Sequence, residues 1–401
     1  MHADGRILTR PFVVGFVLTF LMYFAVGACI PLLPRLVTTG LGGNRADVGI
    51  LAAVFSLSAV LCRPFLSLVS RHGARALAIV GSLLAFVGFG LMWRVPNLGI
   101  LALARVAAAV GEALVWTTFS VLSTSFAPEH RQAEAISLAS VSIFLGFGLG
   151  PLTTEALSRS GRFASAALVP TAASVLCGIC ALCIRREWVP PMVDTTGRLR
   201  RTELFHPAAL LPGLVLALVI LGWSVWNNYV ALRADEIGMA NAAILFSVYS
   251  ALSLVIRLVG AKLPDRIGLR RSASLAAVLV MISLLILGWA KTSTALLVGS
   301  IVMALGIAFT FPSLSVLALQ RLDEPSQRAS LMSSFGMFFE VGAGLGGLVI
   351  APVARQAGLP VAFRVAALGP ALGLLLLHFC RHRFGRGRPV NRALPMTVST
   401  S

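Results

Sequence analysis

Between two apolar runs the chain reads Arg257-Leu-Val-Gly-Ala-Lys-Leu-Pro-Asp265-Arg266-Ile-Gly268-Leu-Arg270-Arg271. An earlier stretch has a similar pattern and reads Arg63-Pro64-Phe-Leu-Ser-Leu-Val-Ser70-Arg71-His72-Gly73-Ala74-Arg75. Two landmarks recur 195 residues later, because Arg71 aligns with Arg266 and Gly73 with Gly268. Repetition at a fixed spacing indicates that one structural unit occurs more than once in a chain. These stretches therefore predict a chain built from two similar parts.

The repeat extends well beyond these two loops. Pro128-x-x-Arg131 recurs as Pro325-x-x-Arg328 at a spacing of 197. A glycine pattern recurs at a spacing of 196, with Gly146, Gly148 and Gly150 matching Gly342, Gly344 and Gly346. The longest polar break, which is rich in arginine and proline, falls between the copies. We therefore predict two halves, 1–190 and 208–401, joined by a cytoplasmic linker at 191–207.

The composition indicates a membrane protein. Of the 401 residues, 57% are hydrophobic and 12% are charged, and the mean hydropathy is +0.90. Soluble domains carry roughly 25% charged residues, so this composition argues against a soluble enzyme or a disordered chain. Apolar runs of about 20 residues match the length of a membrane-spanning helix, whereas a β-barrel would show alternating segments of about 10. The predicted fold is all-α, with twelve spans at about 12–34, 48–69, 76–94, 98–126, 132–157, 163–184, 208–232, 241–263, 272–290, 294–319, 328–354 and 361–380.

The positive charges predict the orientation. The net charge is +18, which in a soluble protein would suggest nucleic acid, but here the charges lie in the loops. With the N-terminus in the cytoplasm, inner segments hold 20 Lys and Arg residues, outer segments hold 9, and 4 fall inside spans. Cytoplasmic loops carry the excess of positive charge. We therefore expect a multi-pass protein of the cell membrane with both termini in the cytoplasm and no nucleic-acid partner.

The loop at 257–271 resembles the signature of the major facilitator superfamily, whose core is Asp-Arg-x-Gly-Arg-Arg/Lys. The spans and the repeat fit this family over nearly the whole chain. The resemblance implies a gating latch that helps to hold the outward-facing state, formed here by Arg71, Gly73, Arg75, Asp265, Arg266, Gly268 and Arg270. Ser70 stands where the family has Asp, which predicts a stronger latch in the second half. The alternative is that these arginines only set topology.

Three residues of the fourth span lie on one helical stripe, because Arg105, Glu112 and Trp116 are seven and four residues apart. Charged groups at this depth are costly, so they usually face a partner or a cavity. The resemblance links Arg105 to proton coupling in exporters of the family. Glu112 is the first candidate for the protonation site, and Glu340 in the eleventh span is the second. The alternative is a structural Arg–Glu interaction.

The fifth span resembles a motif of drug/proton antiporters in this superfamily, through Gly146, Gly150 and Pro151. Small residues four apart let helices approach closely, and proline can kink a helix. Thr154 and Glu155 replace glycines that often follow, so the motif is partial. The resemblance implies the twelve-helix drug and metabolite efflux branch.

Aromatic and amide side chains suit an amphiphilic organic substrate. In the family, helices one, four, seven and ten line the cavity, which gives the candidates Tyr23, Trp116, Trp223, Trp226, Asn227 and Phe309. The competing interpretation is that tryptophan and tyrosine anchor helices at the membrane interface.

The sequence thus predicts a secondary active transporter that exports a drug or metabolite by proton antiport and alternating access. Its partners would be a small-molecule substrate, protons and membrane lipid, and it would act as a monomer. The alternatives are a nutrient permease or facilitator of the same fold and, in another class, a membrane enzyme or sensor. We predict no enzyme and no cofactor, since no Walker loop or catalytic set is present. We also predict no metal site, because Cys177, Cys180 and Cys183 lie in an apolar run.

Overall fold

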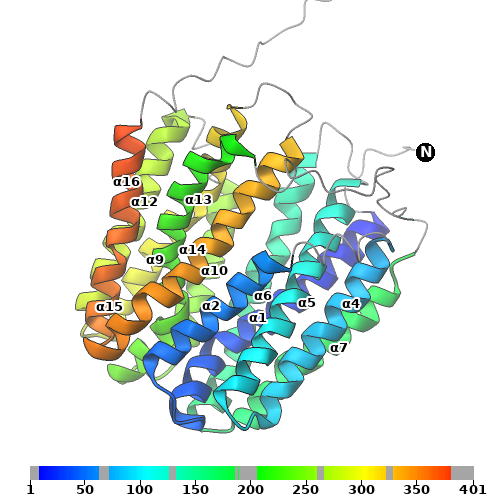
Figure 1. The fold of residues 1–401 in the computed structure, drawn as a ribbon, viewed down its shortest axis with the longest axis horizontal. Coiled ribbons are helices and arrows are strands. Elements are labelled where there is room, and N and C mark those ends of the chain that lie inside the picture. Colours follow the sequence, from blue (N-terminus) through cyan, green and yellow to red (C-terminus); the bar gives the residue numbers. More distant parts are fainter. Residues whose placement is uncertain are drawn as a thin grey trace, which may run out of the picture.

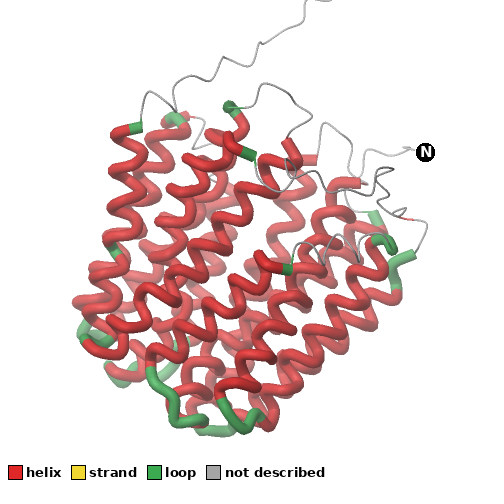
Figure 2. Tube along the Cα trace, viewed as in Figure 1, coloured by secondary structure: helices red, strands yellow, loops and turns green. Residues whose placement is uncertain are grey.

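The computed structural model describes residues 9–62, 72–125, 132–185, 188, 206–259, 266–321 and 328–380. Within these ranges every regular element is a helix, and the long helices run roughly side by side (Figures 1 and 2). Helix α1 begins and helix α16 ends at the same end of the bundle, which we call the terminal end (Figure 1). The opposite end, where α1 and α9 finish, is the far end.

The helices follow the predicted order of apolar runs. Those before the linker are α1 (Arg10–Arg35), α2 (Arg45–Leu61), α4 (Ala74–Leu91), α5 (Leu98–Ser125), α6 (Gln132–Arg159) and α7 (Phe163–Leu182). Those after it are α9 (Leu210–Glu236), α10 (Ala243–Val259), α12 (Leu269–Trp289), α13 (Ser293–Leu319), α14 (Arg328–Gln356), α15 (Leu359–Ala366) and α16 (Leu368–Phe379). A short π-helix, Leu36–Gly40, extends α1. Two 3-10 turns, Met92–Arg94 and Pro207–Ala209, follow α4 and precede α9.

Ten segments of the described chain are long and apolar enough to cross a membrane. Two further helices, α2 and α10, are shorter, with 17 residues each. Their length is about 25 Å at 1.5 Å of rise per residue. The predicted span 361–380 is interrupted at Ala367, between α15 and α16. Pro370 lies in the first turn of α16 and has no N–H to donate to the preceding turn, which explains the break.

Local sequence determines where the helices begin. The Thr9 side chain caps α1, and Asn44 with Asp47 forms a reciprocal capping box at the start of α2. Gly73 and Gly268 precede α4 and α12 with φ of 86° and 89°. This left-handed conformation favours glycine. The two copies of the repeated loop therefore start their helices in the same way.

Glycines let the main helix pairs approach closely. α1 packs along α6, and α9 packs along α14. A Cβ added at Gly146 or Gly150 would lie within 2.6 Å of the α1 backbone at Phe24. At the interface of α14 with α9, a Cβ at Gly342 would lie 2.5 Å from the Ala217 carbonyl oxygen. Side chains larger than hydrogen do not fit at these crossings, so the small residues set the helix spacing.

Candidate functional site

A polar pair lies among aromatic rings near the middle of α1 and α5. The Tyr23 hydroxyl donates to Glu112 Oε1 at 2.5 Å. The Tyr23 ring is 5.3 Å from the Phe147 ring of α6 and 6.2 Å from the Trp116 ring of α5, measured between centroids. Trp116 keeps 41% of its surface exposed, so the cluster is open on one side. We call Tyr23, Glu112, Trp116 and Phe147 the acidic cluster.

A second carboxyl group approaches this cluster from another part of the chain. Glu340 of α14 interacts electrostatically with Tyr23 of α1. The two candidate protonation residues therefore act on one hydroxyl, although they are more than two hundred positions apart in sequence. Carboxyl groups inside membrane-spanning segments commonly carry protons or bind cations in transporters. This arrangement allows one group to sense the charge of the other.

Arg105 lies apart from Glu112, and the two side chains form no ion pair. Arg105 is buried with its guanidinium 4.1 Å from the centre of the Phe55 ring of α2. It also interacts electrostatically with Cys29 of α1. Its Nε has no hydrogen-bond partner among the described residues. Proximity along one helical stripe thus does not bring this arginine and the carboxyl group into direct contact.

The other predicted cavity residues lie in different surroundings. Trp226 is fully buried against Phe246 and Tyr249, and its indole N–H donates to Ser300 at 3.0 Å. Trp223 is half-buried and packs on Phe339, with centroids 5.6 Å apart. Asn227 of α9 and Phe309 of α13 are both partly buried. Trp226 therefore packs α9 against α10 and α13, whereas Trp223 lies beside the residue that precedes Glu340.

The predicted gating loops are described only in part. Gly73, Arg75, Arg266, Gly268 and Arg270 lie at the starts of α4 and α12 at the terminal end. Arg71 and Asp265 lie outside the described residues. In the described part of the two loops, the feature that they share is the glycine in the left-handed conformation before the helix. The latch itself stays a prediction.

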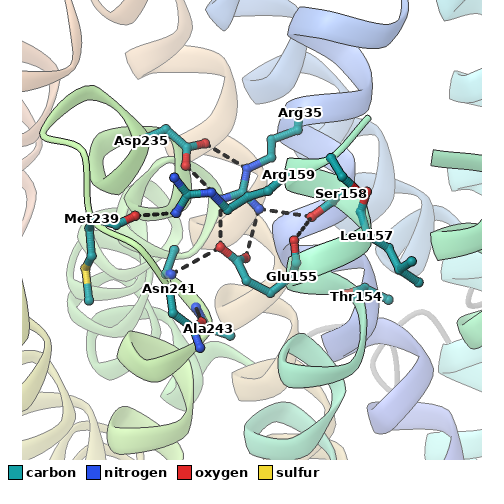
Figure 3. A network of polar contacts seen from close by, with 12 residues as sticks. Arg35, Thr154, Glu155, Leu157, Ser158, Arg159, Asp235, Met239, Asn241 and Ala243 are labelled. Atoms are coloured by element: carbon teal, nitrogen blue, oxygen red, sulfur yellow. Dashed lines mark hydrogen bonds and ion pairs between the residues drawn. The ribbon is translucent and has the colours of Figure 1, made fainter. Parts of the chain in front are cut away.

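At the far end, Arg35 of α1 joins α6 and α9 through a buried network (Figure 3). Its two Nη atoms donate to the Glu155 carboxylate at 2.8 and 2.9 Å. Nε and Nη2 donate to the Asp235 carboxylate at 2.7 and 2.9 Å, and Nη1 donates to Ser158 at 3.0 Å. A guanidinium offers five N–H donors, and all are used here. The Arg35 side chain is only 4% exposed. We call these four residues the far-end network.

Neighbouring contacts extend the far-end network toward α9 and the start of α10. Glu155 Oε1 also accepts from the Ala242 N–H at 3.1 Å, and Arg159 donates to the Met239 carbonyl oxygen (Figure 3). Arg45, at the start of α2, pairs with Glu236 at the end of α9. Every one of these contacts joins a segment before the linker to a segment after it. Polar contacts therefore join these two parts of the chain at the far end.

Sequence reasoning missed this network. In the sequence, Arg35, Arg45 and Arg159 counted only among the nine basic residues of the outer segments, and Glu155 only as a residue that stands in place of a glycine. One signal was available: acidic residues are rare in this chain, and Glu155, Asp235 and Glu236 each lie near the end of a predicted span and within four residues of an arginine. Arg35 and its acidic partners are separated by 120 and 200 positions, so their pairing needs the fold.

Comparisons with known proteins agree with this architecture. A family model described as Major Facilitator Superfamily matches residues 15–239 and 213–397. An uncharacterized MFS-type transporter of Burkholderia mallei (strain SAVP1) is 26% identical over 372 residues, and the match covers 89% of each chain. The nucleoside transporter NupG aligns with a TM-score of 0.77 at 14% identity, covering 92% of this chain and 99% of that chain. A POT family transporter in complex with a thioalcohol-conjugated peptide aligns with a TM-score of 0.75 at 13% identity, covering 94% and 97%. The chain therefore belongs to the Major Facilitator Superfamily and is a multi-pass membrane transporter.

Proposed function

We propose that this protein is a secondary active transporter that exports small organic compounds in exchange for protons. The Tyr23–Glu112 hydrogen bond is the observation that carries the proposal. It holds a carboxyl group among aromatic rings half-way along a membrane helix, where ionisable residues commonly mark proton relays. Glu340 acts on the same tyrosine, which provides a second acidic group for a proton or a substrate charge.

The proposed architecture has twelve spans in two six-helix halves, 1–190 and 208–401, with α2 and α10 as spans two and eight and α15 with α16 as span twelve. The contacts that support it occur in pairs. α1 packs on α6 as α9 packs on α14, and α4 packs on α5 as α12 packs on α13. Between the halves, α6 meets α10 and α14 meets α2.

The glycines at these crossings support the same symmetry. A Cβ added at Gly148 of α6 would lie 3.1 Å from the Ser250 Cβ of α10. A Cβ added at Gly344 of α14 would lie 3.2 Å from Leu57 and 3.6 Å from Ser56 of α2. These glycines are 196 positions apart, and the two serines are 194 apart. This correspondence supports an interface between the halves that repeats about a two-fold axis, as expected for parallel repeats.

Both termini are proposed to lie in the cytoplasm, so the far end of the bundle would face the outer side of the cell membrane. The arginine excess at the terminal end supports this orientation.

Large apolar side chains such as Leu61, Val259 and Phe379 are exposed, as suits helices that contact lipid. The chain is proposed to act as a monomer, because each half supplies residues to the central clusters of the same chain.

Transport would proceed by alternating access. The far-end network closes the outer side in the state described here, so opening to the outside must separate Arg35 from Asp235. The outward-open and inward-open states would differ in their affinity for a proton at the Tyr23–Glu112 pair and for the substrate. Binding of either one would therefore shift the equilibrium between the two states. The efflux branch suggested by Gly146, Gly150 and Pro151 remains part of this proposal.

The test is a transport screen with purified protein in liposomes. Candidate compounds are placed outside liposomes with an acidic interior, and accumulation inside is followed by mass spectrometry. Antiport predicts accumulation that stops when a protonophore collapses the gradient. Accumulation only with the reversed gradient would indicate proton-coupled uptake, and movement without gradient dependence would indicate a facilitator. Chemical conversion without movement would contradict transport altogether.

Nutrient uptake is the second candidate function. It is an alternative function of the same fold, which a nucleoside transporter and a POT family transporter in complex with a peptide share with this chain. At 14% and 13% identity these likenesses carry the fold and no substrate. The direction of the gradient in the same assay separates the two functions.

A further inference from the structure

The geometry points to a binding site for an anionic group, carried by an apolar or aromatic substrate, at Arg257. This inference rests on the proposed transport function and names the substrate class: organic anions, with a carboxylate as the simplest example. The site consists of Trp223 of α9 and of Tyr249, Ser253 and Arg257 of α10, which we call the basic cluster. It was not predicted from the sequence, where Arg257 appeared only as the first residue of the 257–271 loop.

Arg257 is a partly buried cation with no countercharge among the described residues. Its guanidinium is 4.8 Å from the centre of the Phe144 ring of α6. Its Nε is buried and has no hydrogen-bond partner among the described residues, and no carboxylate of the described chain pairs with it. Burying a charge is costly unless the charge is paired and hydrogen-bonded. An arginine left in this condition fits a group that arrives from elsewhere, and carboxylates match its forked geometry best.

The surrounding polar groups are also available to a ligand. Tyr249 lies beside the Trp223 indole N–H and the Ser253 hydroxyl. Neither group reaches hydrogen-bonding geometry: Trp223 Nε1 and Ser253 Oγ are buried, without partners in the described part of the chain. Ser253 is completely buried. Unpaired buried donors are rare in folded proteins, and each is costly. An anion between α9 and α10 would satisfy several of them together.

The basic cluster adjoins the acidic cluster. Phe144 contacts Arg257, and Phe147, one turn further along α6, contacts Tyr23. Three residues of helix correspond to about 4.5 Å of rise. On the other side, Trp223 packs on Phe339, which precedes Glu340. Aromatic rings thus separate a cationic pole from an acidic pole, and an aromatic body could lie across them with its anionic group at Arg257. The carboxyl groups would then serve to bind protons rather than substrate.

The test compares three compounds of one skeleton: 4-phenylbutanoate, 4-phenylbutylamine and 4-phenylbutan-1-ol, together with their shorter and longer homologues. Binding to the purified full-length protein is measured by thermal stabilisation and by tryptophan fluorescence. We expect the best carboxylate to bind about tenfold more tightly than its amine and alcohol counterparts, as suits a charge-assisted hydrogen bond. Arg257→Gln should reduce this preference to about twofold or less.

Two further variants keep the result interpretable. Arg257→Lys retains the charge without the fork and should keep part of the preference. Arg364→Gln is the matched control, because Arg364 also lies over an aromatic ring, 5.9 Å from the centre of Trp289, but belongs to neither cluster. It should leave the preference unchanged. The inference is overturned if no carboxylate binds more tightly than its alcohol, or if Arg257→Gln keeps the full preference.

Liposome measurements separate this inference from the proposed function. A carboxylate that binds through Arg257 but is never moved would contradict transport and leave the anion site standing. Gradient-driven movement of amines or alcohols that is indifferent to Arg257→Gln would support transport and overturn the anion site.

Discussion

The two ends of the bundle are built differently. At the far end, one buried arginine binds two carboxylates, one from α6 and one from α9, and further polar contacts surround it. At the terminal end, the described part of the repeated loops consists of a left-handed glycine and arginines at the start of α4 and α12. The far end therefore holds specific long-range bonds, whereas the terminal end holds a local turn used twice. We propose that the far-end network is the outer gate and that the repeated loop is the inner gate.

Removal of the Arg35 side chain should have the largest effect on how often the far end opens. Arg35→Gln leaves the Glu155 carboxylate buried without its cation, and breaking a buried pair costs about 3–5 kcal/mol. We expect the far end to open more often and turnover to slow. Cys29, which is buried on α1 about two turns from Arg35, reports this opening once the other five cysteines are replaced. Its modification by a membrane-impermeant reagent added at the far end should increase strongly.

Arg94→Gln is the matched control, because Arg94 is an exposed arginine near the same end that lies over the Trp93 ring. It should leave Cys29 modification unchanged. Equal modification in Arg35→Gln and in the parent protein would show that the far-end network does not hold the gate.

The two acidic partners of Arg35 should differ from each other. The Glu155 side chain is 5% exposed, whereas the Asp235 side chain is 31% exposed and better screened by water. Glu155→Gln should therefore lower the free energy of unfolding more than Asp235→Asn, by about 1–3 kcal/mol for the more buried group. Asp235→Asn should open the far end more, because the Arg35–Asp235 contact joins α1 to α9 and must break on opening, whereas the Arg35–Glu155 contact joins α1 to α6. Cys29 modification rates compare the opening of the two variants directly. A larger increase in Glu155→Gln would mean that the contact with α6 controls the gate.

At the terminal end, the sequence predicts that loss of the loop latch shifts the protein toward the inward-facing state, opposite to the effect of opening the far end. Asp265→Asn removes the acidic residue of the better-preserved loop copy and should favour the inward-facing state, slowing turnover. Ser70→Ala alters the copy that already lacks the acid and should do little. The rate at which a reagent added from the terminal side modifies Cys29, together with the transport rate, distinguishes the two variants. If Ser70→Ala is as damaging as Asp265→Asn, the two loops are equivalent and the asymmetry is wrong.

The smallest effect is expected at the rim of the far end. Arg45 pairs with Glu236, but their side chains are 38% and 25% exposed, and such pairs contribute about 0–1 kcal/mol. Arg45→Gln should change Cys29 modification only slightly. High salt should remove the remaining difference, because it screens exposed charges. A change as large as that of Arg35→Gln would place the gate at the rim.

Much of the fold could be predicted from the sequence, because apolar runs of this length have few alternatives. The predicted span 163–184 corresponds to α7, Phe163–Leu182, and the span 12–34 to α1, Arg10–Arg35. The family was also predicted correctly from the 257–271 loop. Such features are local or periodic, so they can be read along the chain.

The candidate site was less predictable, because its contacts depend on how each helix is rotated. Buried residues lie all around α9, so the sequence does not reveal that Trp226 is buried while Trp223 lies beside Phe339. Helical spacing placed Arg105 and Glu112 on one stripe, but each side chain finds its partner on another helix, Phe55 and Tyr23 respectively. The far-end network and the basic cluster likewise join residues from distant helices.

The central claim is that Glu112 couples protons to transport, and substrate exchange in liposomes tests it most directly. A compound identified in the transport screen is measured in two modes: accumulation driven by a pH gradient, and exchange of labelled for unlabelled compound without a gradient. The account predicts that Glu112→Gln abolishes accumulation while exchange continues, and that Glu340→Gln has a weaker effect on accumulation. Gradient-driven accumulation at the parent rate in Glu112→Gln would contradict the account.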